Sequence, residues 1–342
     1  MTLSIRAALA WLGPGRLVAD AQVVCDGGVI TYAGPATPIS GADETLDVGG
    51  FLMPAVADRH VHIELSDPAA VLRGGVTAVR DLAWPPERIF PLADASELPS
   101  YRGPLIRAAG PMLTGHGGYP TGEAWAPPGT GRELAGTDDA TEVVRDLAGR
   151  GATAIKVSLN IESGPTPTDA ELAAMCDEAH RHDLPVTAHP QGAGQVERAL
   201  GAGIDELAHT PWTRLSDEVI EAAAARMRIV STLDILSFGR DTPQIRAAID
   251  NLRRFHAAGG TVIYGTDLGN GPIPPGIHTQ EVLLLRDAGL ESEEILQAMV
   301  RAPMDLDAPA DLIALARSPL DDLTAFDDLR LVIRAGSVVL AR

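Results

Sequence analysis

The spacing of hydrophobic and polar residues divides the chain into two kinds of segment. Toward both ends, short runs of β-forming residues alternate with glycine-containing turns. These runs lie at 17–24, 29–35, 311–315, 329–333 and 337–340. Runs of this kind joined by tight turns are typical of strands in antiparallel sheets. We therefore predict one small β-sandwich domain built from both chain ends, residues 1–52 plus 306–342.

The middle of the chain alternates between apolar runs and helical patterns. Eight candidate strands lie at 54–60, 76–81, 104–109, 154–158, 185–189, 204–209, 229–233 and 261–267. Candidate helices lie at 138–150, 168–182, 193–202, 216–228 and 242–258. Thr168 and Glu171 have the spacing of a capping box at the start of one helix. The alternation predicts an α/β fold, a (β/α)₈ TIM-like barrel over residues 53–305.

Composition narrows the possible partners. The formal net charge of -19 argues against nucleic acid and anionic membrane surfaces, since both are bound by basic patches. The 2 cysteines rule out a disulfide framework and a cysteine-rich zinc site. No apolar run is long enough to cross a bilayer. We expect a cytoplasmic protein with a small-molecule substrate; a homo-oligomer is compatible with the sequence.

The predicted strands end in residues that bind metals. In a barrel of this kind, the chemistry collects at the carboxyl ends of the strands. The residues found there are His60, His62, Lys156, His189, His209 and Asp267. His60 and His62 are two residues apart, which places both rings on one face of an extended chain. Any one of these residues alone reads as structural, whereas the set of nitrogen and oxygen donors predicts a site for zinc or a similar divalent ion.

Lys156 is the only lysine in the sequence, and every other residue in the count of lysines and arginines is an arginine. A guanidinium stays protonated in a protein, whereas a buried ammonium can lose its proton and act as a nucleophile. The apolar neighbours Ala154, Ile155 and Val157 predict a buried strand. Lys156 is therefore a candidate for amine chemistry at the metal site.

These motifs resemble those of the amidohydrolase superfamily, metal-dependent hydrolases built on a (β/α)₈ barrel. Met53-Pro54-Ala55-Val56-Ala57-Asp58-Arg59-His60-Val61-His62 is similar to the family's Pro-Gly-Leu-Ile-Asp-x-His-x-His motif. The segments around Lys156, His189, His209 and Asp267 match later family positions. Gly75-Val76-Thr77-Ala78-Val79-Arg80-Asp81 resembles the branch that contains prolidase-like, aryldialkylphosphatase-like and imidazolonepropionase-related enzymes.

The resemblance implies a binuclear centre of two divalent ions, expected to be Zn²⁺, bridged by a carbamate on Lys156. It assigns His60, His62 and Asp267 to the more buried ion, and His189 and His209 to the more exposed one. It further implies that a metal-bridging hydroxide attacks an amide or cyclic amide C–N bond. Asp267 is the expected catalytic residue, which accepts the hydroxide proton and passes it to the leaving nitrogen.

Three other functions stay open at this point. One is a mononuclear deaminase or ring-opening hydrolase of a heterocycle, against which Lys156 counts. Another is a lactone or phosphoester hydrolase, since the same hydroxide attacks those bonds. The third is a catalytically inactive metal-binding scaffold. Metal analysis separates the binuclear, mononuclear and scaffold hypotheses.

The candidate substrate contacts lie in loops above the predicted strand ends. The loop 110–137 is rich in glycine and proline, and is expected either to cover the metals as a lid or to pack on the barrel rim. Prolidase-like relatives tend to carry an aromatic residue or histidine two residues beyond the equivalent of His189, where this chain has Gln191, which puts dipeptide specificity in doubt. The predicted contacts are His116, Tyr119, Gln191 and His278.

Overall fold

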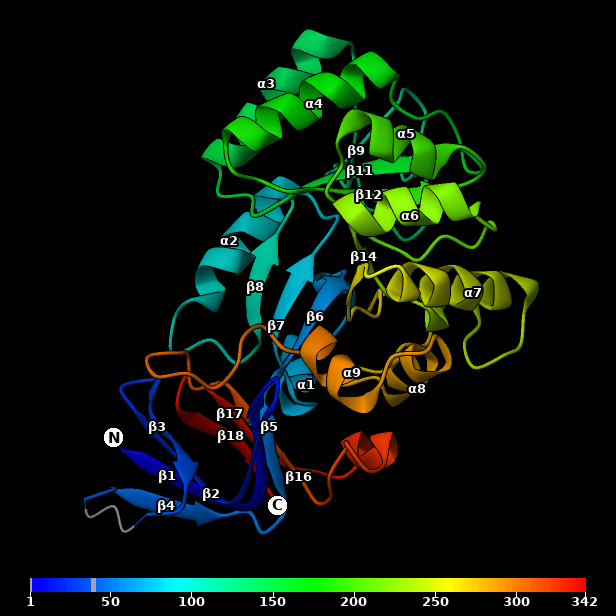
Figure 1. Ribbon diagram of the computed structural model, residues 1–342. Coiled ribbons are helices and arrows are strands. Elements are labelled where there is room, and N and C mark those ends of the chain that lie inside the picture. Colours follow the sequence, from blue (N-terminus) through cyan, green and yellow to red (C-terminus); the bar gives the residue numbers. More distant parts are fainter. Residues whose placement is uncertain (1, 38–40) are drawn as a thin grey trace.

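Strands from both ends of the chain form one mixed sheet in the computed structural model, which describes residues 2–37 and 41–342 (Figure 1). The hydrogen-bonded order is β18-β17-β16-β5-β1-β2-β3, and β4 pairs with β1. The strands are β1 (Leu3–Gly13), β2 (Arg16–Asp26), β3 (Val29–Pro35), β4 (Glu44–Asp47), β5 (Phe51–Pro54), β16 (Leu312–Leu315), β17 (Leu329–Arg334) and β18 (Ser337–Ala341). The segments predicted to form a sandwich are thus hydrogen-bonded into a single sheet, and β5 crosses the predicted domain boundary at residue 53.

The middle of the chain contains two parallel sheets. One has the order β6-β7-β8, with β6 (Val56–Val61), β7 (Val76–Asp81) and β8 (Leu105–Ala108). The other has the order β10-β9-β11-β12-β13-β14-β15. Its strands are β9 (Met112–Thr114), β10 (Gly131–Glu133), β11 (Ile155–Asn160), β12 (Val186–Gln191), β13 (Glu206–Leu207), β14 (Arg228–Val230) and β15 (Thr261–Ile263). Parallel strands joined by helices confirm the predicted α/β class.

Backbone hydrogen bonds join the two parallel sheets at both edges. At one edge, the Thr153 N–H donates to the Ala108 carbonyl at 2.9 Å. At the other edge, the chain after β15 reaches β6: the Asp267 N–H donates to the His60 carbonyl at 2.8 Å, and the His62 N–H donates to the Leu268 carbonyl at 2.7 Å. These bonds place Asp267 directly beside the two histidines of the first strand.

Helices cover the outer faces of the parallel sheets (Figure 1). They are α1 (Pro68–Arg73), α2 (Pro86–Ser96), α3 (Thr137–Gly149), α4 (Asp169–Arg181), α5 (Gln195–Ala202), α6 (Asp217–Arg226), α7 (Pro243–Ala257), α8 (Thr279–Asp287) and α9 (Ser292–Met299). Short 3₁₀ turns lie at η1 (Ile63–Leu65), η2 (Asp234–Leu236) and η3 (Leu323–Asp327). The five predicted helices are α3 to α7, each confirmed to within two residues at either end.

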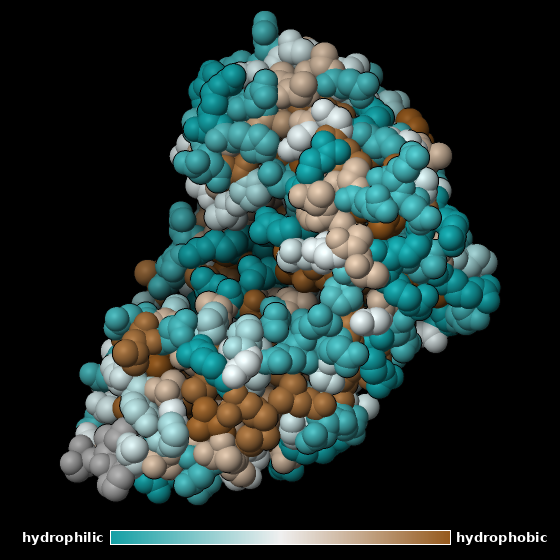
Figure 2. Space-filling model, viewed as in Figure 1, coloured by the Kyte–Doolittle hydropathy of each residue, from teal (hydrophilic) through white to brown (hydrophobic). Residues whose placement is uncertain are grey.

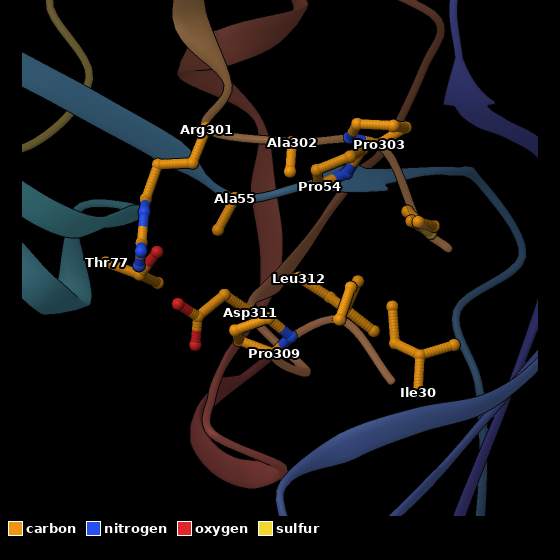
Figure 3. Close-up of a pocket in the computed structure, with 12 residues that line it drawn as sticks. Ile30, Pro54, Ala55, Thr77, Arg301, Ala302, Pro303, Pro309, Asp311 and Leu312 are labelled. Carbon is orange, nitrogen blue, oxygen red and sulfur yellow. The ribbon is translucent and has the colours of Figure 1, made fainter. Parts of the chain in front are cut away.

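The mixed sheet meets the parallel strands around a cavity of about 120 Å³. Figure 3 shows the side chains of Arg301, Thr77 and Asp311 converging there. The Ala335 N–H donates to Asp311 Oδ1 at 2.8 Å, and burial raises the pKa of this carboxyl. The cavity lies away from the carboxyl ends of the strands.

The surface differs between the two parts of the molecule. In Figure 2, hydrophilic side chains dominate the helical part, and a hydrophobic patch lies over the part that holds the mixed sheet. None of the described helices combines the length and apolarity that crossing a lipid bilayer requires.

Candidate metal centre

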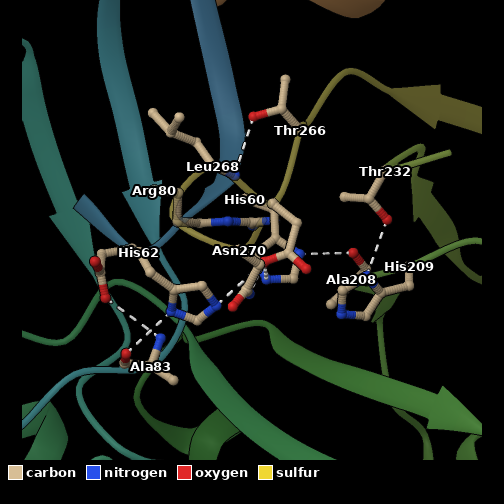
Figure 4. Close-up of polar contacts among 12 residues, drawn as sticks. His60, His62, Arg80, Ala83, Ala208, His209, Thr232, Thr266, Leu268 and Asn270 are labelled. Carbon is tan, nitrogen blue, oxygen red and sulfur yellow. Dashed lines mark hydrogen bonds and ion pairs between the residues drawn. The ribbon is translucent and has the colours of Figure 1, made fainter. Parts of the chain in front are cut away.

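His60 and His62 present their Nε2 atoms to the same carboxylate. Both side chains are buried at the end of β6. His60 Nδ1 lies 2.8 Å from the Ala208 carbonyl oxygen, and His62 Nδ1 lies 3.2 Å from the Ala83 carbonyl oxygen (Figure 4). Burial lowers the pKa of His60 well below its ordinary value, whereas the pKa of His62 is raised, because the hydrogen bond and charge of Asp267 outweigh burial. A carbonyl only accepts, so each ring carries a proton on Nδ1 and directs Nε2 toward Asp267. This is the arrangement found around metal-binding histidines.

Asp267 is held in a strained backbone conformation opposite these rings. Its φ of 59° lies in the left-handed region, which costs a non-glycine residue on the order of 1–3 kcal/mol and is concentrated at functional sites. Asp267 Oδ1 lies 3.4 Å from His60 Nε2 and 3.2 Å from His62 Nε2, and it accepts a hydrogen bond from Asn270 Nδ2 at 2.9 Å. Burial by itself would raise the pKa of this carboxyl, but the two histidines hold it below its ordinary value. Asp267 is therefore an ionised ligand candidate.

His189 and His209 complete a cluster of rings with His60. The ring centroids of His189 and His209 are 4.3 Å apart, and those of His209 and His60 are 4.5 Å apart. His209 Nδ1 is hydrogen-bonded to Thr232 Oγ1 at 3.0 Å, and His189 Nε2 lies 3.3 Å from Asn160 Nδ2. Burial lowers the pKa of His189 to about 3 and that of His209 well below its ordinary value. These imidazoles are neutral, which is the form that binds metals.

Lys156 lies near enough to this cluster to interact electrostatically with His60, His189, His209 and Asp267. It is 0% exposed on β11, in register with Thr187 of β12. Within the described residues, its Nζ atom has no hydrogen-bond partner. Burial lowers the pKa of the Lys156 amine to about 7. An unpartnered buried ammonium is costly, so this position suits an amine that is converted to another group or neutralised.

The donor set fits a metal ion. Ligand atoms of His60, His209 and Asp267 all lie within 4.8 Å of one another, and all three residues are buried. Among the described residues, neither His60 Nε2 nor Lys156 Nζ has a hydrogen-bond partner, which fits a site that binds a metal ion. Five of the six predicted ligands lie in the second half of a strand or after its end. Lys156 is instead the second residue of β11, which continues to Asn160, so the prediction that it stands at a strand end was wrong.

The predicted loop 110–137 lies over this cluster. The Trp125 ring is 4.8 Å from the His62 ring, and the Tyr119 ring is 5.0 Å from the His189 ring. The two aromatic rings are 6.2 Å apart. Part of the loop is ordered as β9 and β10. Trp125 was not among the predicted substrate contacts, because an aromatic residue in a glycine-rich and proline-rich loop gives no sign of the direction in which it points.

The other predicted substrate contacts have different surroundings. His116 is not brought to the cluster: its side chain is 94% exposed, because Glu133 binds both His116 Nδ1, at 2.5 Å, and the Gly117 N–H, at 2.9 Å. His278 Nε2 lies 2.8 Å from Asp234 Oδ2, so this ring is engaged in a buried pair. Gln191 follows His189 by two residues on β12, which places both on one face of the strand.

Gln191 is buried, and neither Oε1 nor Nε2 has a hydrogen-bond partner among the described residues. A buried amide with both ends unpaired is costly and rare in folded proteins. A ligand that both donates and accepts would satisfy it. Gln191 is therefore the predicted contact whose surroundings most resemble a binding position.

Comparison with known proteins finds a family match and relatives with named activities. The sequence profile of the amidohydrolase family matches residues 51–304. Imidazolonepropionase of Caulobacter vibrioides is 46% identical over 66 residues, which are 17% of this chain and only 16% of that protein. Ochratoxinase of Aspergillus niger is 25% identical over 408 aligned residues, covering 96% of this chain and 84% of that protein.

Solved structures share the fold over nearly the whole chain. A Xaa-Pro dipeptidase with bound methionine superposes with a TM-score of 0.85 at 20% identity, covering 99% of both chains. The ochratoxinase of A. niger superposes with a TM-score of 0.84 at 22% identity, covering 99% of this chain and 96% of that one. The profile match spans most of the chain and includes all six candidate ligands. The chain therefore belongs to the amidohydrolase family and is a metal-dependent hydrolase.

Proposed function

We propose that the chain is a binuclear metal-dependent hydrolase that cleaves an amide or cyclic amide C–N bond. The observation that carries the proposal is the buried Lys156 Nζ atom, which has no hydrogen-bond partner among the described residues. Lys156 also interacts electrostatically with His60, His189, His209 and Asp267. A carbamate, formed when the neutral amine adds carbon dioxide and releases a proton, would supply two oxygens to bridge two ions, which a guanidinium does not do. Zn²⁺ is the expected ion, since imidazole and carboxylate donors suit it.

The proposal includes a closed (β/α)₈ barrel over residues 53–305. The hydrogen bonds between the two parallel sheets at both edges support closure. In this arrangement the mixed sheet, whose strands lie between Leu3 and Pro54 and between Leu312 and Ala341, is a separate small domain. The cluster of ligands then lies at the carboxyl ends of the barrel strands, where such barrels hold their active sites.

Each ligand has a role in this proposal. His60, His62 and Asp267 would hold one ion, His189 and His209 would hold the other, and a carbamate on Lys156 would join them. When bound, two divalent ions activate a water and polarise the substrate carbonyl. The Asp267 carboxylate would accept the proton of the attacking water and pass it to the leaving nitrogen. The rings of Tyr119 and Trp125 cover the cluster and exclude bulk solvent.

The expected substrate carries a neutral polar group near the scissile bond. Gln191 offers one donor and one acceptor, which an amide or lactam group pairs with fully and a carboxylate only in part. The names of the relatives, an ochratoxinase, an imidazolonepropionase and a Xaa-Pro dipeptidase, support hydrolysis of C–N bonds in general. They span several substrate types, so the specificity rests on the residues of this chain.

The test combines metal analysis with a hydrolysis screen. Metal-loaded protein is assayed against N-acyl amino acids, dipeptides, cyclic imides and lactones, and its metal content is measured by mass spectrometry. We expect about two ions per chain and hydrolysis of amides or imides. Lys156→Ala should lose one or both ions, and its kcat/KM should fall by more than about 100-fold. Loss of a group that hydrogen-bonds to a metal ligand typically costs about 10-fold to 100-fold, and loss of the ligand itself should cost more. Two ions and full activity in Lys156→Ala would contradict the bridging role.

A mononuclear hydrolase is the second candidate. It is favoured by the close grouping of His60, His209 and Asp267, whose ligand atoms alone could hold a single ion. About one ion per chain, with deamination or ring opening of a heterocycle, would select it. Activity confined to lactones or phosphoesters would support the same metal centre acting on another class of substrate. Absence of bound metal would support a catalytically inactive scaffold.

A further inference from the structure

A second polar cavity lies at the opposite ends of the strands from the metal cluster. It is bordered by residues at the starts of β13, β14 and β15, namely Glu206, Arg228 and Thr261, and it has a volume of about 180 Å³. Arg59 of β6 and Arg80 of β7 also line it. His209 and Asp267 follow the carboxyl ends of β13 and β15, whereas the cavity borders the starts of these strands. None of the six candidate ligands lines the cavity, so it is separate from the proposed active site.

The lining of the cavity carries an excess of positive charge. Three of its lining residues are arginines, and Glu206 is its one carboxylate in the described part of the chain. Arg80 Nη2 pairs with Glu206 Oε1, and Arg228 Nη2 lies 3.6 Å from Glu206 Oε2, beyond hydrogen-bond distance. One carboxylate against three guanidiniums leaves two positive charges unbalanced. This contrasts with a whole chain whose formal net charge is -19.

The inner arginines are fixed in place but not fully paired. Arg80 Nε donates to the Arg59 carbonyl at 3.0 Å, and Arg59 Nη2 donates to the Val300 carbonyl at 3.3 Å. Arg59 Nε is buried and has no hydrogen-bond partner in the described residues. Glu206 Oε2 is also buried and accepts no hydrogen bond from them. A buried guanidinium donor without an acceptor carries a desolvation cost. It marks a place for an acceptor supplied from outside the chain.

The outer arginine stands at the mouth of the cavity. The Arg228 side chain is 45% exposed, so it can be reached from solvent and can turn toward an incoming group. Thr261 and Gln297 also line the cavity and add a hydroxyl and an amide to the available donors. The set combines one inner guanidinium, one outer guanidinium and neutral donors.

We propose that this cavity binds a small oxyanion, a phosphate or a carboxylate, between the guanidinium groups of Arg59 and Arg228. Guanidinium forks match the oxygen geometry of both anions, and hydrogen bonds between ionised partners are stronger than neutral ones. The bound anion balances the unpaired charge and ties β6 to the start of β14. The site stands independently of the reaction proposed above.

Inorganic phosphate is the probe that tests the site. Thermal unfolding of the full metal-loaded chain is measured with increasing phosphate and with sodium chloride at equal ionic strength. Phosphate should raise the melting temperature saturably beyond the chloride effect, because it binds only the folded state. Arg228→Gln should weaken this response about tenfold in phosphate concentration. Arg226→Gln, which changes an exposed arginine two residues away on α6, should leave it intact.

Two results would overturn the proposal. One is a phosphate response no larger than that of chloride. The other is an undiminished response in Arg228→Gln, which would assign phosphate to the metal ions instead. Melting in chloride and metal content show whether Arg228→Gln is folded, and if it is not, Arg228→Lys takes its place and should weaken the response while keeping the charge. An acetate arm distinguishes a general carboxylate site from one that prefers phosphate.

Discussion

At the scale of single residues, the metal centre is defined by what holds each ligand. The protonated Nδ1 atoms of His60 and His62 are fixed by backbone carbonyls, which no substitution removes. His209 instead depends on a side chain, the hydroxyl of Thr232. Thr232 has a φ of 38°, in the left-handed region, so the backbone there is held against its own preference. This hydroxyl is the supporting contact that a mutation can test.

Replacing Thr232 by valine should loosen the metal centre. Valine keeps the shape of threonine but removes the hydrogen bond to His209 Nδ1, and losses of this kind typically reduce metal affinity about 10-fold to 100-fold. Affinity is measured by competition with a chelator. Thr210→Val is the matched control, because the Thr210 hydroxyl donates to the Ser231 carbonyl and not to a ligand. Equal affinities in the two variants would contradict this role.

Removing the Trp125 ring should alter substrate binding and not metal binding. The ring lies 4.8 Å from that of His62 and covers it from the loop side. We expect Trp125→Ala to keep its metal content and to lose about tenfold or more in kcat/KM, the scale of a buried aromatic contact. Metal analysis and steady-state kinetics on an active substrate are the measurements. Unchanged kcat/KM would show that the loop does not take part.

Glu281 should make stability depend on pH. It is fully buried and accepts hydrogen bonds from the Leu233 and Asp234 N–H groups at 2.9 and 2.7 Å, and burial raises its pKa from 4.5 to about 7. The folded state therefore holds a proton that the unfolded state has released. This contribution to stability is complete below pH 4.5 and is lost as pH rises toward about 7.

Urea unfolding of the wild type and Glu281→Gln across this range tests that contribution. The free energy of unfolding of the wild type should fall more steeply between about pH 5 and about pH 8 than that of the variant, which does not titrate. Parallel curves would show that Glu281 is ionised throughout. Burial also raises the pKa of Asp58 to about 7, and the charge of Glu281 adds to that shift, so the difference between the two proteins includes the response of Asp58.

At the scale of elements, local sequence signals located the helices well and the strand ends less well. In α4, Thr168 Oγ1 accepts from the Glu171 N–H at 3.2 Å, and Glu171 Oε2 accepts from the Thr168 N–H at 2.7 Å, as the capping-box spacing predicted. The last strand was predicted over 261–267 but ends at Ile263. Beyond it the chain leaves its neighbour β14 and hydrogen-bonds to β6.

α2 was not predicted, and its sequence explains why. Pro85 and Pro86 stand at its start and Pro91 lies inside it, which breaks the pattern of an amphipathic helix. Proline is tolerated in the first turn because those N–H groups have no intrahelical partner. Pro91 comes one turn later and normally disfavours a helix, so only the packing of Ile89 and Phe90 into the core identifies the element.

Removing the cap of α4 should lower stability by a modest amount. Thr168→Ala loses one of the two reciprocal hydrogen bonds and should reduce the free energy of unfolding by about 1 kcal/mol. Thr141→Ala on α3 is the control, because its hydroxyl bonds only to the Thr137 carbonyl one turn earlier on an exposed face. We expect a change within about 0.5 kcal/mol for the control. Equal losses in urea unfolding would exclude a specific capping effect.

At the scale of the whole molecule, the metal centre joins segments that are far apart in sequence. His60 and His62 come from the first strand of the parallel sheets, and Asp267 follows the last. An ion held by these ligands ties the two sheets together at the edge where they meet. Because the metal binds only the folded chain, it should stabilise the entire fold and not the site alone.

Removing the metal should therefore lower the melting temperature. At a free metal concentration of about 1,000 times the dissociation constant, binding contributes about 4 kcal/mol to the free energy of unfolding. Calorimetry before and after chelation, followed by addition of Zn²⁺, measures the effect. On addition of Zn²⁺, Lys156→Ala should regain less of the lost melting temperature than the wild type does. A melting temperature unaffected by chelation would show that the ligand cluster folds without an ion.

The sequence by itself determined the α/β class, most of the helices and the six candidate ligands. It could do so because hydrophobic periodicity and strand-end position are local properties. Tertiary structure alone decided that His116 faces solvent, that Trp125 covers His62 and that the Gln191 amide is unpaired. It also decided that Arg59 and Arg228 share a cavity. Such contacts depend on how distant segments pack, and no local pattern records the direction in which a loop or surface side chain points.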